Sequence, residues 1–191
     1  MDARLEVTGF GTLTVDTALG GDRFVIVEAE ALGFDLTESE AAELAKCGIK
    51  ITAAVTEQLG FTHPDNPDWR HIYICAFAGP LEERKSGLAS RSTVVIRPGK
   101  IDRSPTGTAV SARMAVMAAR GQMHVDQKFF ATSIIGSQFT RQIVSQTQIG
   151  GKAAIIPQIS GRGWITGVHQ HMLDPADPWP EGDRLGDTWG H

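Results

Sequence analysis

The residues best suited to chemistry lie in one polar turn, DRSPTGT at positions 102–108, directly ahead of an alanine-rich apolar segment at 109–120. The apolar residues of that segment fall on nearly every face of a helix, which is typical of a helix buried on all sides. Ser104 followed by proline suits an N-cap and a first helical position, and Thr106 is an equally acceptable cap. The turn therefore predicts the start of a buried helix, with its cap at either residue.

The backbone of this turn favours an anion. Unpaired N–H groups around Thr106, Gly107 and Thr108 would gather at the positive end of the helix dipole, where carboxylates and phosphates bind. Gly107 would let a ligand approach the backbone closely. From the pattern alone, a capped core helix without any ligand explains the turn as well as an anion site does.

The exact sequence of the turn favours an anion site over a plain capped helix. DRSPTGT and the following SARMA (111–115) resemble the second active-site motif of the proline racemase family, which includes 4-hydroxyproline epimerases and trans-3-hydroxy-L-proline dehydratases. In the racemases and epimerases of that family the motif holds a catalytic cysteine where this chain has Thr106. Threonine at this position is the pattern of the dehydratase branch. The resemblance extends from about Leu5 to Trp189 and includes GWITG at 163–167.

The resemblance implies an α+β fold like one lobe of diaminopimelate epimerase, in which a β-barrel-like sheet wraps around a buried central helix at about 107–120. Family members have two such lobes, and the first contributes a Cys-Gly-His motif that this sequence does not contain. We therefore expect the C-terminal portion of a longer protein. On this interpretation residues 1–17 are connecting strands from the first lobe and residues 18–150 are the second lobe. Residues 151–191 are then strands and a tail that return to the first lobe.

The resemblance also implies a cofactor-independent reaction on a proline derivative. The N–H groups of Gly107 and Thr108 would bind its carboxylate, and Asp102 would contact its ring nitrogen. Thr106, at the catalytic position, is too weak an acid and base for two-base racemisation, but its hydroxyl can hydrogen-bond a 3-hydroxyl group or a water. We therefore expect part of a trans-3-hydroxy-L-proline dehydratase that forms pyrroline-2-carboxylate. This chain alone should turn over little substrate, because the Cys-Gly-His base is absent.

Two alternatives stay open at this point. One is an isomerase of the 4-hydroxyproline epimerase or proline racemase type. The other is a non-catalytic binding module that retains the carboxylate site around Gly107 and Thr108.

The composition excludes other classes of partner and site. A net charge of −4 with mixed signs gives no basic footprint for nucleic acid, and no apolar run is long enough to span a membrane. The N-terminus lacks the regions of a signal peptide, so we expect a cytoplasmic protein. The surface left uncovered by an absent lobe predicts self-association or a homodimer. Cys47 and Cys75 have no metal-type spacing and are interpreted as small core residues.

A metal site was the remaining candidate. His169 and His171 would share one face of an expected strand, and Asp174 and Asp177 follow closely, a ligand set that a transition metal accepts. Two histidines on one strand are more often surface residues, and the resembled family uses no metal. We therefore expect no metal here.

Elsewhere the pattern predicts mainly strands. Thr37 and Glu40 form a capping box that begins a helix, which Gly60 ends. Gly20–Gly21 predicts a hairpin turn, and the charged segment 81–92 predicts a solvated loop or hairpin end. Apolar runs and alternation predict strands at two places within 5–16 and at 23–29, 71–78, 93–97, 128–135, 139–149, 153–160 and 164–172.

Overall fold

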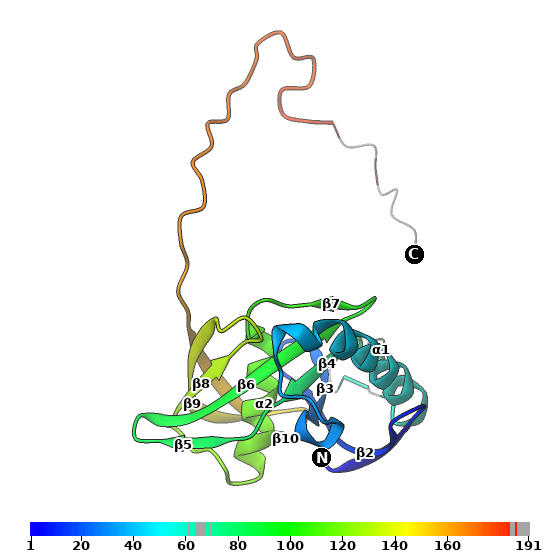
Figure 1. Cartoon of the computed structure of the whole chain (residues 1–191). Coiled ribbons are helices and arrows are strands. Elements are labelled where there is room, and N and C mark those ends of the chain that lie inside the picture. Colours follow the sequence, from blue (N-terminus) through cyan, green and yellow to red (C-terminus); the bar gives the residue numbers. More distant parts are fainter. Residues whose placement is uncertain (61, 64–67, 69, 184–185, 187–191) are drawn as a thin grey trace.

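The computed structural model of the chain describes residues 1–60, 62–63, 68, 70–183 and 186 (Figure 1). The strands are β1 (Ala3–Val7), β2 (Gly11–Leu19), β3 (Arg23–Glu28), β4 (Ile74–Ala78), β5 (Glu82–Arg84), β6 (Gly87–Ile96), β7 (Lys100–Ile101), β8 (Lys128–Thr132), β9 (Gln138–Ile149) and β10 (Lys152–Ser160). The helices are α1 (Ala41–Gln58) and α2 (Gly107–Ala119), and two short 3-10 turns, η1 (Glu30–Leu32) and η2 (Glu38–Glu40), precede α1.

All the strands in the described part of the chain belong to one sheet, in the order β1-β2-β3-β4-β6-β8-β9-β10, with β5 and β7 paired to β6. Two neighbouring pairs are parallel, β3 with β4 and β6 with β8, and the other ladders are antiparallel. Each parallel pair is joined through a helix, α1 for the first pair and α2 for the second. The sheet is therefore built around two β-α-β connections.

The direction of these strands decides where the helices lie. The two connections start from β3 and β6, which run in opposite directions because β3 is parallel to β4 and β4 is antiparallel to β6. Both connections lead to the next strand on the same side in the sheet order, from β3 to β4 and from β6 to β8. Connections of this kind are right-handed almost without exception. The two helices must therefore cover opposite faces of the sheet.

The packing agrees with that requirement. On β3, Val25 and Val27 belong to the core that includes α1, whereas Phe24 and Ile26 belong to the core that includes α2. The residues of α1 in its core are Leu44, Cys47, Ile51, Ala54 and Val55. The residues of α2 that pack inside the sheet are Ala109, Val110, Ala112, Met114, Val116 and Met117.

The sheet curls so that both of its ends approach α2, which packs against β2 and β3 on one side and β10 on the other. One stripe of the helix stays open between β2 and β10. There Ala115 and Ala119 line a cavity of about 900 Å³ together with Leu19 and Ile155. The predicted α+β fold, with a barrel-like sheet around a central helix, is confirmed, with this opening along one side.

Two sequence predictions differ from the structure. Of the two interpretations of segment 81–92, the hairpin end is observed, because β5 and β6 pair there. The solvated loop is wrong, because Leu88, Ser90 and Ser92 are buried. The segment 164–172 forms no strand, because no other described strand pairs with it. The capping box at Thr37, the Gly20–Gly21 hairpin and the other strands are observed, with β8 ending at Thr132 rather than Ile135.

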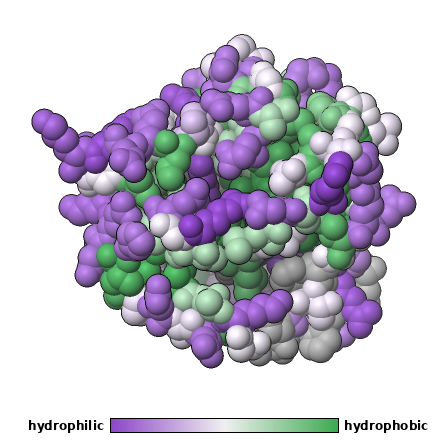
Figure 2. Space-filling view, turned by 90° about the horizontal axis from the view of Figure 1, so that it is seen from below, coloured by the Kyte–Doolittle hydropathy of each residue, from purple (hydrophilic) through white to green (hydrophobic). Residues whose placement is uncertain are grey.

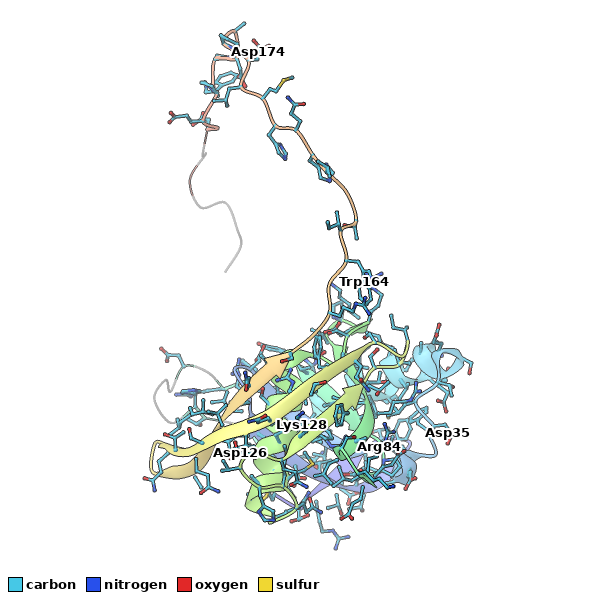
Figure 3. All side chains as sticks on the ribbon, turned by 90° about the vertical axis from the view of Figure 1, so that its left-hand side faces the viewer. Asp35, Arg84, Asp126, Lys128, Trp164 and Asp174 are labelled. Atoms are coloured by element: carbon cyan, nitrogen blue, oxygen red, sulfur yellow. The ribbon has the colours of Figure 1, made fainter. Side chains whose placement is uncertain are left out.

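Beyond β10 the chain leaves the folded body. Residues 161–183 form an extended segment that projects from the sheet, with Trp164 near its base and Asp174 near its far end (Figures 1 and 3). Apolar side chains along it are largely exposed: Trp164 71%, Ile165 91%, Val168 93%, Met172 81%, Leu173 75% and Trp179 61%. On the body itself, apolar residues also show between polar ones on the face in Figure 2.

Candidate functional site

The polar turn is placed by the strand that precedes it. The N–H of Asp102 donates to the carbonyl of Val94 on β6, at 3.1 Å. The chain then crosses to α2, whose first helical residue is Gly107. Because the side chain of Val94 is buried against α2, the turn starts from a rigid part of the sheet.

Side-chain hydrogen bonds shape the turn. Thr106 Oγ1 donates to Asp102 Oδ2 at 2.6 Å, and the N–H of Ser104 donates to Asp102 Oδ1 at 2.8 Å. The N–H of Thr106 in turn donates to Ser104 Oγ at 3.1 Å. The carboxylate of Asp102 therefore holds the turn together by accepting hydrogen bonds from both Ser104 and Thr106. The Thr106 hydroxyl points at that carboxylate instead of capping the helix.

Thr106 occupies the N-cap position in an unusual backbone conformation, with φ at 57° and ψ at 106°. A positive φ in a β-branched residue is a genuine outlier, and such strain costs about 1–3 kcal/mol and gathers at functional sites. Of the two caps that the sequence allowed, the structure selects Thr106, yet its side chain makes no capping hydrogen bond. The strained backbone leaves the first turn of α2 open.

The N–H groups of this first turn are available to a ligand. Within the described residues, no hydrogen bond occupies the N–H groups of Gly107 and Thr108. Gly107 is half-buried and Thr108 is exposed. Asp102, Thr106, Gly107 and Thr108 are thus brought together at one helix N-terminus, the positive end of the helix dipole, as the sequence predicted.

The hairpin between β2 and β3 fixes the other side of that N-terminus. A Cβ atom on Gly20 would lie 2.1 Å from the carbonyl oxygen of Thr108 and 2.5 Å from the backbone nitrogen of Ala112. Only glycine permits this approach. The hairpin interpretation of Gly20 is correct, but the sequence did not reveal that Gly20 also positions the first turn of α2.

The opposite end of α2 is tied to the same strand. Arg120 Nη1 lies 2.8 Å from Asp16 Oδ2 on β2, and Asp16 is buried. A cation at a helix C-terminus is favoured by the helix dipole. Both ends of the helix are therefore held against β2, which keeps the open N-terminus in place.

Sequence reasoning missed one residue beside the site, Arg141 on β9. Its side chain is 1% exposed, and its Nη1 donates to Ser111 Oγ at 2.9 Å. Ser111 Oγ donates in turn to the carbonyl of Gly107 at 3.0 Å. Nothing in the strand pattern marked Arg141, because charged residues on strands are usually solvated.

The two cysteines lie away from this turn, in the core around α1. Burial raises the pKa of the Cys47 thiol to about 11 and also raises the pKa of Cys75. A thiol must ionise to act as a nucleophile or base. Their interpretation as core residues is confirmed.

His169 and His171 lie in the exposed segment beyond β10, with ring centroids 6.4 Å apart. Among the described residues, no group of three or more histidine, cysteine, aspartate or glutamate side chains is arranged to hold a metal ion. A search of the same residues finds no helix with the length and apolar character needed to cross a membrane.

Comparison with known proteins identifies a family and similar solved structures. The sequence profile described as proline racemase matches residues 1–184. A probable proline racemase from Agrobacterium radiobacter K84, solved with bound carbonate, is 33% identical with a TM-score of 0.80. A hydroxyproline epimerase from Agrobacterium vitis, solved with bound trans-4-hydroxy-L-proline, is 35% identical with a TM-score of 0.80.

Both alignments cover 100% of this chain but only 55% and 54% of the two solved chains. This chain therefore spans about half the length of those proteins. The likeness includes the barrel-like sheet and its central helix, so it concerns the fold that carries the candidate site. The extent of the profile match and the level of identity show that the chain belongs to the proline racemase family.

Proposed function

We propose that this chain forms one half of an active site that breaks the Cα–H bond of a proline derivative, and that the complete reaction is dehydration of trans-3-hydroxy-L-proline. The hydroxyproline epimerase neighbour supports a cyclic amino acid as the substrate class. The substrate carboxylate would accept hydrogen bonds from the N–H groups of Gly107 and Thr108. There the helix dipole also stabilises the charge that builds up when the α-proton leaves.

Asp102 and Thr106 have separate roles in this proposal. The carboxylate of Asp102 pairs with the ring ammonium and orients the ring. Thr106 Oγ1, which donates to Asp102 in the structure, turns its lone pairs or its proton toward the 3-hydroxyl of the substrate. A base outside this chain removes the α-proton, the C3–O bond breaks, and the base returns that proton to the departing hydroxyl, which leaves as water. The enamine that remains tautomerises to pyrroline-2-carboxylate.

The observation that carries the dehydratase proposal is the chemistry of position 106. A racemase needs a proton acceptor and a proton donor on opposite faces of Cα, and a threonine hydroxyl is too weak an acid and base to act as either. The thiols of Cys47 and Cys75 lie in the core around α1 with raised pKa values, so neither replaces a cysteine here. One-base elimination is the reaction of this family that fits a threonine.

The second candidate is an epimerase or racemase, and the 35% identity to the Agrobacterium vitis epimerase favours it. On that proposal a water held by Thr106 and Asp102 would carry the second proton. The two candidates differ in what happens to trans-4-hydroxy-L-proline, which an epimerase inverts at Cα and a dehydratase leaves unchanged.

The test is to assay the chain alone and joined to the part of the Agrobacterium vitis epimerase that it does not cover. Pyrroline-2-carboxylate is trapped with o-aminobenzaldehyde, and inversion is followed by polarimetry. We expect no turnover by the chain alone. The joined protein should dehydrate trans-3-hydroxy-L-proline, and Thr106→Cys should lower dehydration and add epimerisation.

The matched control is Thr37→Cys, which places the same thiol at the N-cap of η2, ahead of α1, and should add no epimerisation. Efficient epimerisation of trans-4-hydroxy-L-proline by the joined protein with Thr106 intact would overturn the dehydratase proposal in favour of the second candidate. Exchange of the α-proton with D₂O, read by NMR, reports proton abstraction even where neither product forms.

The domain division is a further part of the proposal. We place residues 1–17 and 151–191 with a partner lobe outside this chain and residues 18–150 in the lobe around α2. The exposed apolar side chains of residues 161–183 support it, because a soluble protein rarely leaves so many uncovered. The first boundary falls within β2 and the second falls in the turn between β9 and β10.

This division predicts self-association of the isolated chain. Light scattering should give a mass that rises with concentration, and a variant that ends at Ser160 should stay monomeric because the exposed segment is absent. A full-length chain that stays a monodisperse monomer at high concentration would contradict this part of the proposal. It would leave the assignment of the α2 site unaffected.

A further inference from the structure

Arg141 lies directly beside the open N-terminus of α2. A Cβ atom placed on Gly107 would be 3.1 Å from Arg141 Nη2, so the guanidinium borders the backbone of Gly107. Its Nη1 is held by Ser111 one turn further along the helix, and its Cζ lies 5.6 Å from the centre of the Phe139 ring. One edge of the guanidinium is therefore fixed, while the other faces the start of α2.

That second edge lacks hydrogen-bond partners. Nε and Nη2 of Arg141 are both buried without an acceptor. A buried polar group without a partner is costly, and a buried charge more so, which makes such a group rare in native proteins. Burial lowers the pKa of Arg141 to about 10, so the side chain still carries its charge at neutral pH.

A second buried arginine shows what a satisfied one looks like in this fold. Arg113, on α2, is also buried, but its Nη1 donates to Ser90 Oγ at 2.7 Å and its Nη2 to the carbonyl of Gly79 at 2.6 Å. The charge of Glu28 also acts on Arg113. The same sequence thus provides acceptors for one buried guanidinium and leaves half of the other without them.

The open edge of Arg141 and the open N–H groups of α2 meet at Gly107. The other atom close to the missing Cβ of Gly107 is Cδ1 of Ile159, at 3.6 Å, and the side chain of Ile159 is 49% exposed. The side chain of Ile159 must therefore shift for a ligand to reach the guanidinium past Gly107. Both sets of donors there attract negative charge.

We propose that Arg141 binds the substrate carboxylate, with its Nε and Nη2 completing the site formed by the N–H groups of Gly107 and Thr108. One carboxylate oxygen accepts from the helix N-terminus and the other from the guanidinium, which favours a planar anion over a neutral group. The substrate class rests on the proposed function. The anion requirement rests on the geometry around Gly107.

The test is an NMR titration of the full chain with trans-4-hydroxy-L-proline, read at the amides of Gly107 and Thr108 and at the Arg141 Nε–H signal. All three signals should shift together. The neutral carboxamide of the same amino acid should shift none of them at the same concentration. Arg141→Lys, which keeps the charge but loses the two-nitrogen edge, should weaken binding about tenfold, and Arg141→Met more than that.

Two control variants are matched to Arg141. Arg113→Lys changes another buried arginine, one that does not border Gly107, and Arg84→Met removes an exposed arginine that pairs with Glu82. Both should bind the amino acid as the unmodified chain does. The titration of the unmodified chain needs no variant to fold, so it decides the proposal even if Arg141→Met does not.

Each outcome separates this inference from the proposed function. Shifts at Gly107 and Thr108 with an unchanged Arg141 signal, or equal affinity in Arg141→Lys, would overturn the inference and leave the proposed reaction standing. The absence of any shift at all three groups would also overturn it. Shifts at all three, with no dehydration by the joined protein, would support the inference and overturn the proposed reaction.

Discussion

The two helices of this fold begin in opposite ways. Ahead of α1, the carboxylate of Glu40 accepts from the N–H of Thr37 at 2.7 Å and from the N–H of Asp35 at 3.1 Å, within a capping box. Ahead of α2, the N-cap Thr106 turns its hydroxyl away to Asp102, and no side chain caps the first turn.

This contrast separates a structural helix end from a functional one. Caps exist because the first N–H groups of a helix have no partner within the helix. The turn η2 runs directly into α1, and its own capping box closes the start of that helical segment. α2 keeps its first N–H groups open at the cost of a strained residue, Thr106, and places the buried Arg141 beside them. A helix N-terminus is a candidate binding site when no group of the protein accepts hydrogen bonds from its first N–H groups.

Of the variants that test this contrast, Gly20→Ala should cause the largest loss of stability. The new methyl group would fall within 2.5 Å of backbone atoms of α2, which cannot move aside as a side chain can, so the hairpin or the helix must shift. Overpacking of this kind costs about 1–3 kcal/mol, and we expect the upper end. Urea unfolding followed by circular dichroism measures it.

The matched control for that variant is Gly33→Ala. Gly33 has nothing within 4 Å of its absent Cβ but a positive φ of 76°, so alanine there costs about 1 kcal/mol of backbone strain alone. Equal losses for the two variants would mean that contact between Gly20 and α2 does not hold the open N-terminus.

Asp102→Ala should have an intermediate effect. It removes the acceptor for both Thr106 Oγ1 and the N–H of Ser104, and a net loss of about 1–2 kcal/mol is expected from two hydrogen bonds, less the strain released at Thr106. Thr37→Ala is the counterpart at α1 and should cost about 1 kcal/mol. An Asp102→Ala variant as stable as the unmodified chain would show that the turn does not depend on this carboxylate.

Glu40→Gln should have the smallest effect and sharpens the contrast through pH. Hydrogen bonds from the backbone N–H groups of Thr37 and Asp35 lower the pKa of Glu40. A carboxyl group whose pKa is lowered in the folded state adds stability above its unfolded value, near 4.5, and loses it as the pH falls through the folded value.

The difference in unfolding free energy between the unmodified chain and Glu40→Gln should therefore be present at neutral pH and shrink below about pH 4.5. Because the side chain is exposed and screened, the difference should stay below about 1 kcal/mol. If the difference in unfolding free energy did not depend on pH, the stabilising contribution of Glu40 would come from its packing rather than from its charge.

Much of the fold could be predicted from the sequence, because its signals are local. The capping box at Thr37 and the apolar residues of α2 each depend on spacing within one turn of chain. The first half of β6 was missed because the charged segment 81–92 suggested a solvated loop or hairpin end. In the fold, Arg113 reaches Ser90 from α2 and satisfies it while both are buried. A polar residue buried through a distant partner gives no local signal.

The features of the candidate site likewise fall into those that the sequence could predict and those that it could not. The composition of the turn placed Asp102, Thr106, Gly107 and Thr108 together, since they are neighbours in the chain. The positive φ of Thr106, the approach of Gly20 and the guanidinium of Arg141 come from three-dimensional packing, so sequence reasoning had no means to find them. The segment 164–172 carries a strand pattern, and a strand forms only where a partner completes its ladder.

The position of β4 has a consequence for the order in which the molecule opens. All five of its residues are buried, both of its edges are paired, and the two helices cover its two faces. Its amide protons should therefore exchange with solvent only through global unfolding, whereas those of β1 and β10 at the margins of the sheet should exchange through local fraying. Amide exchange would then separate a rigid centre, shared by both helices, from the margins that border the opening along α2.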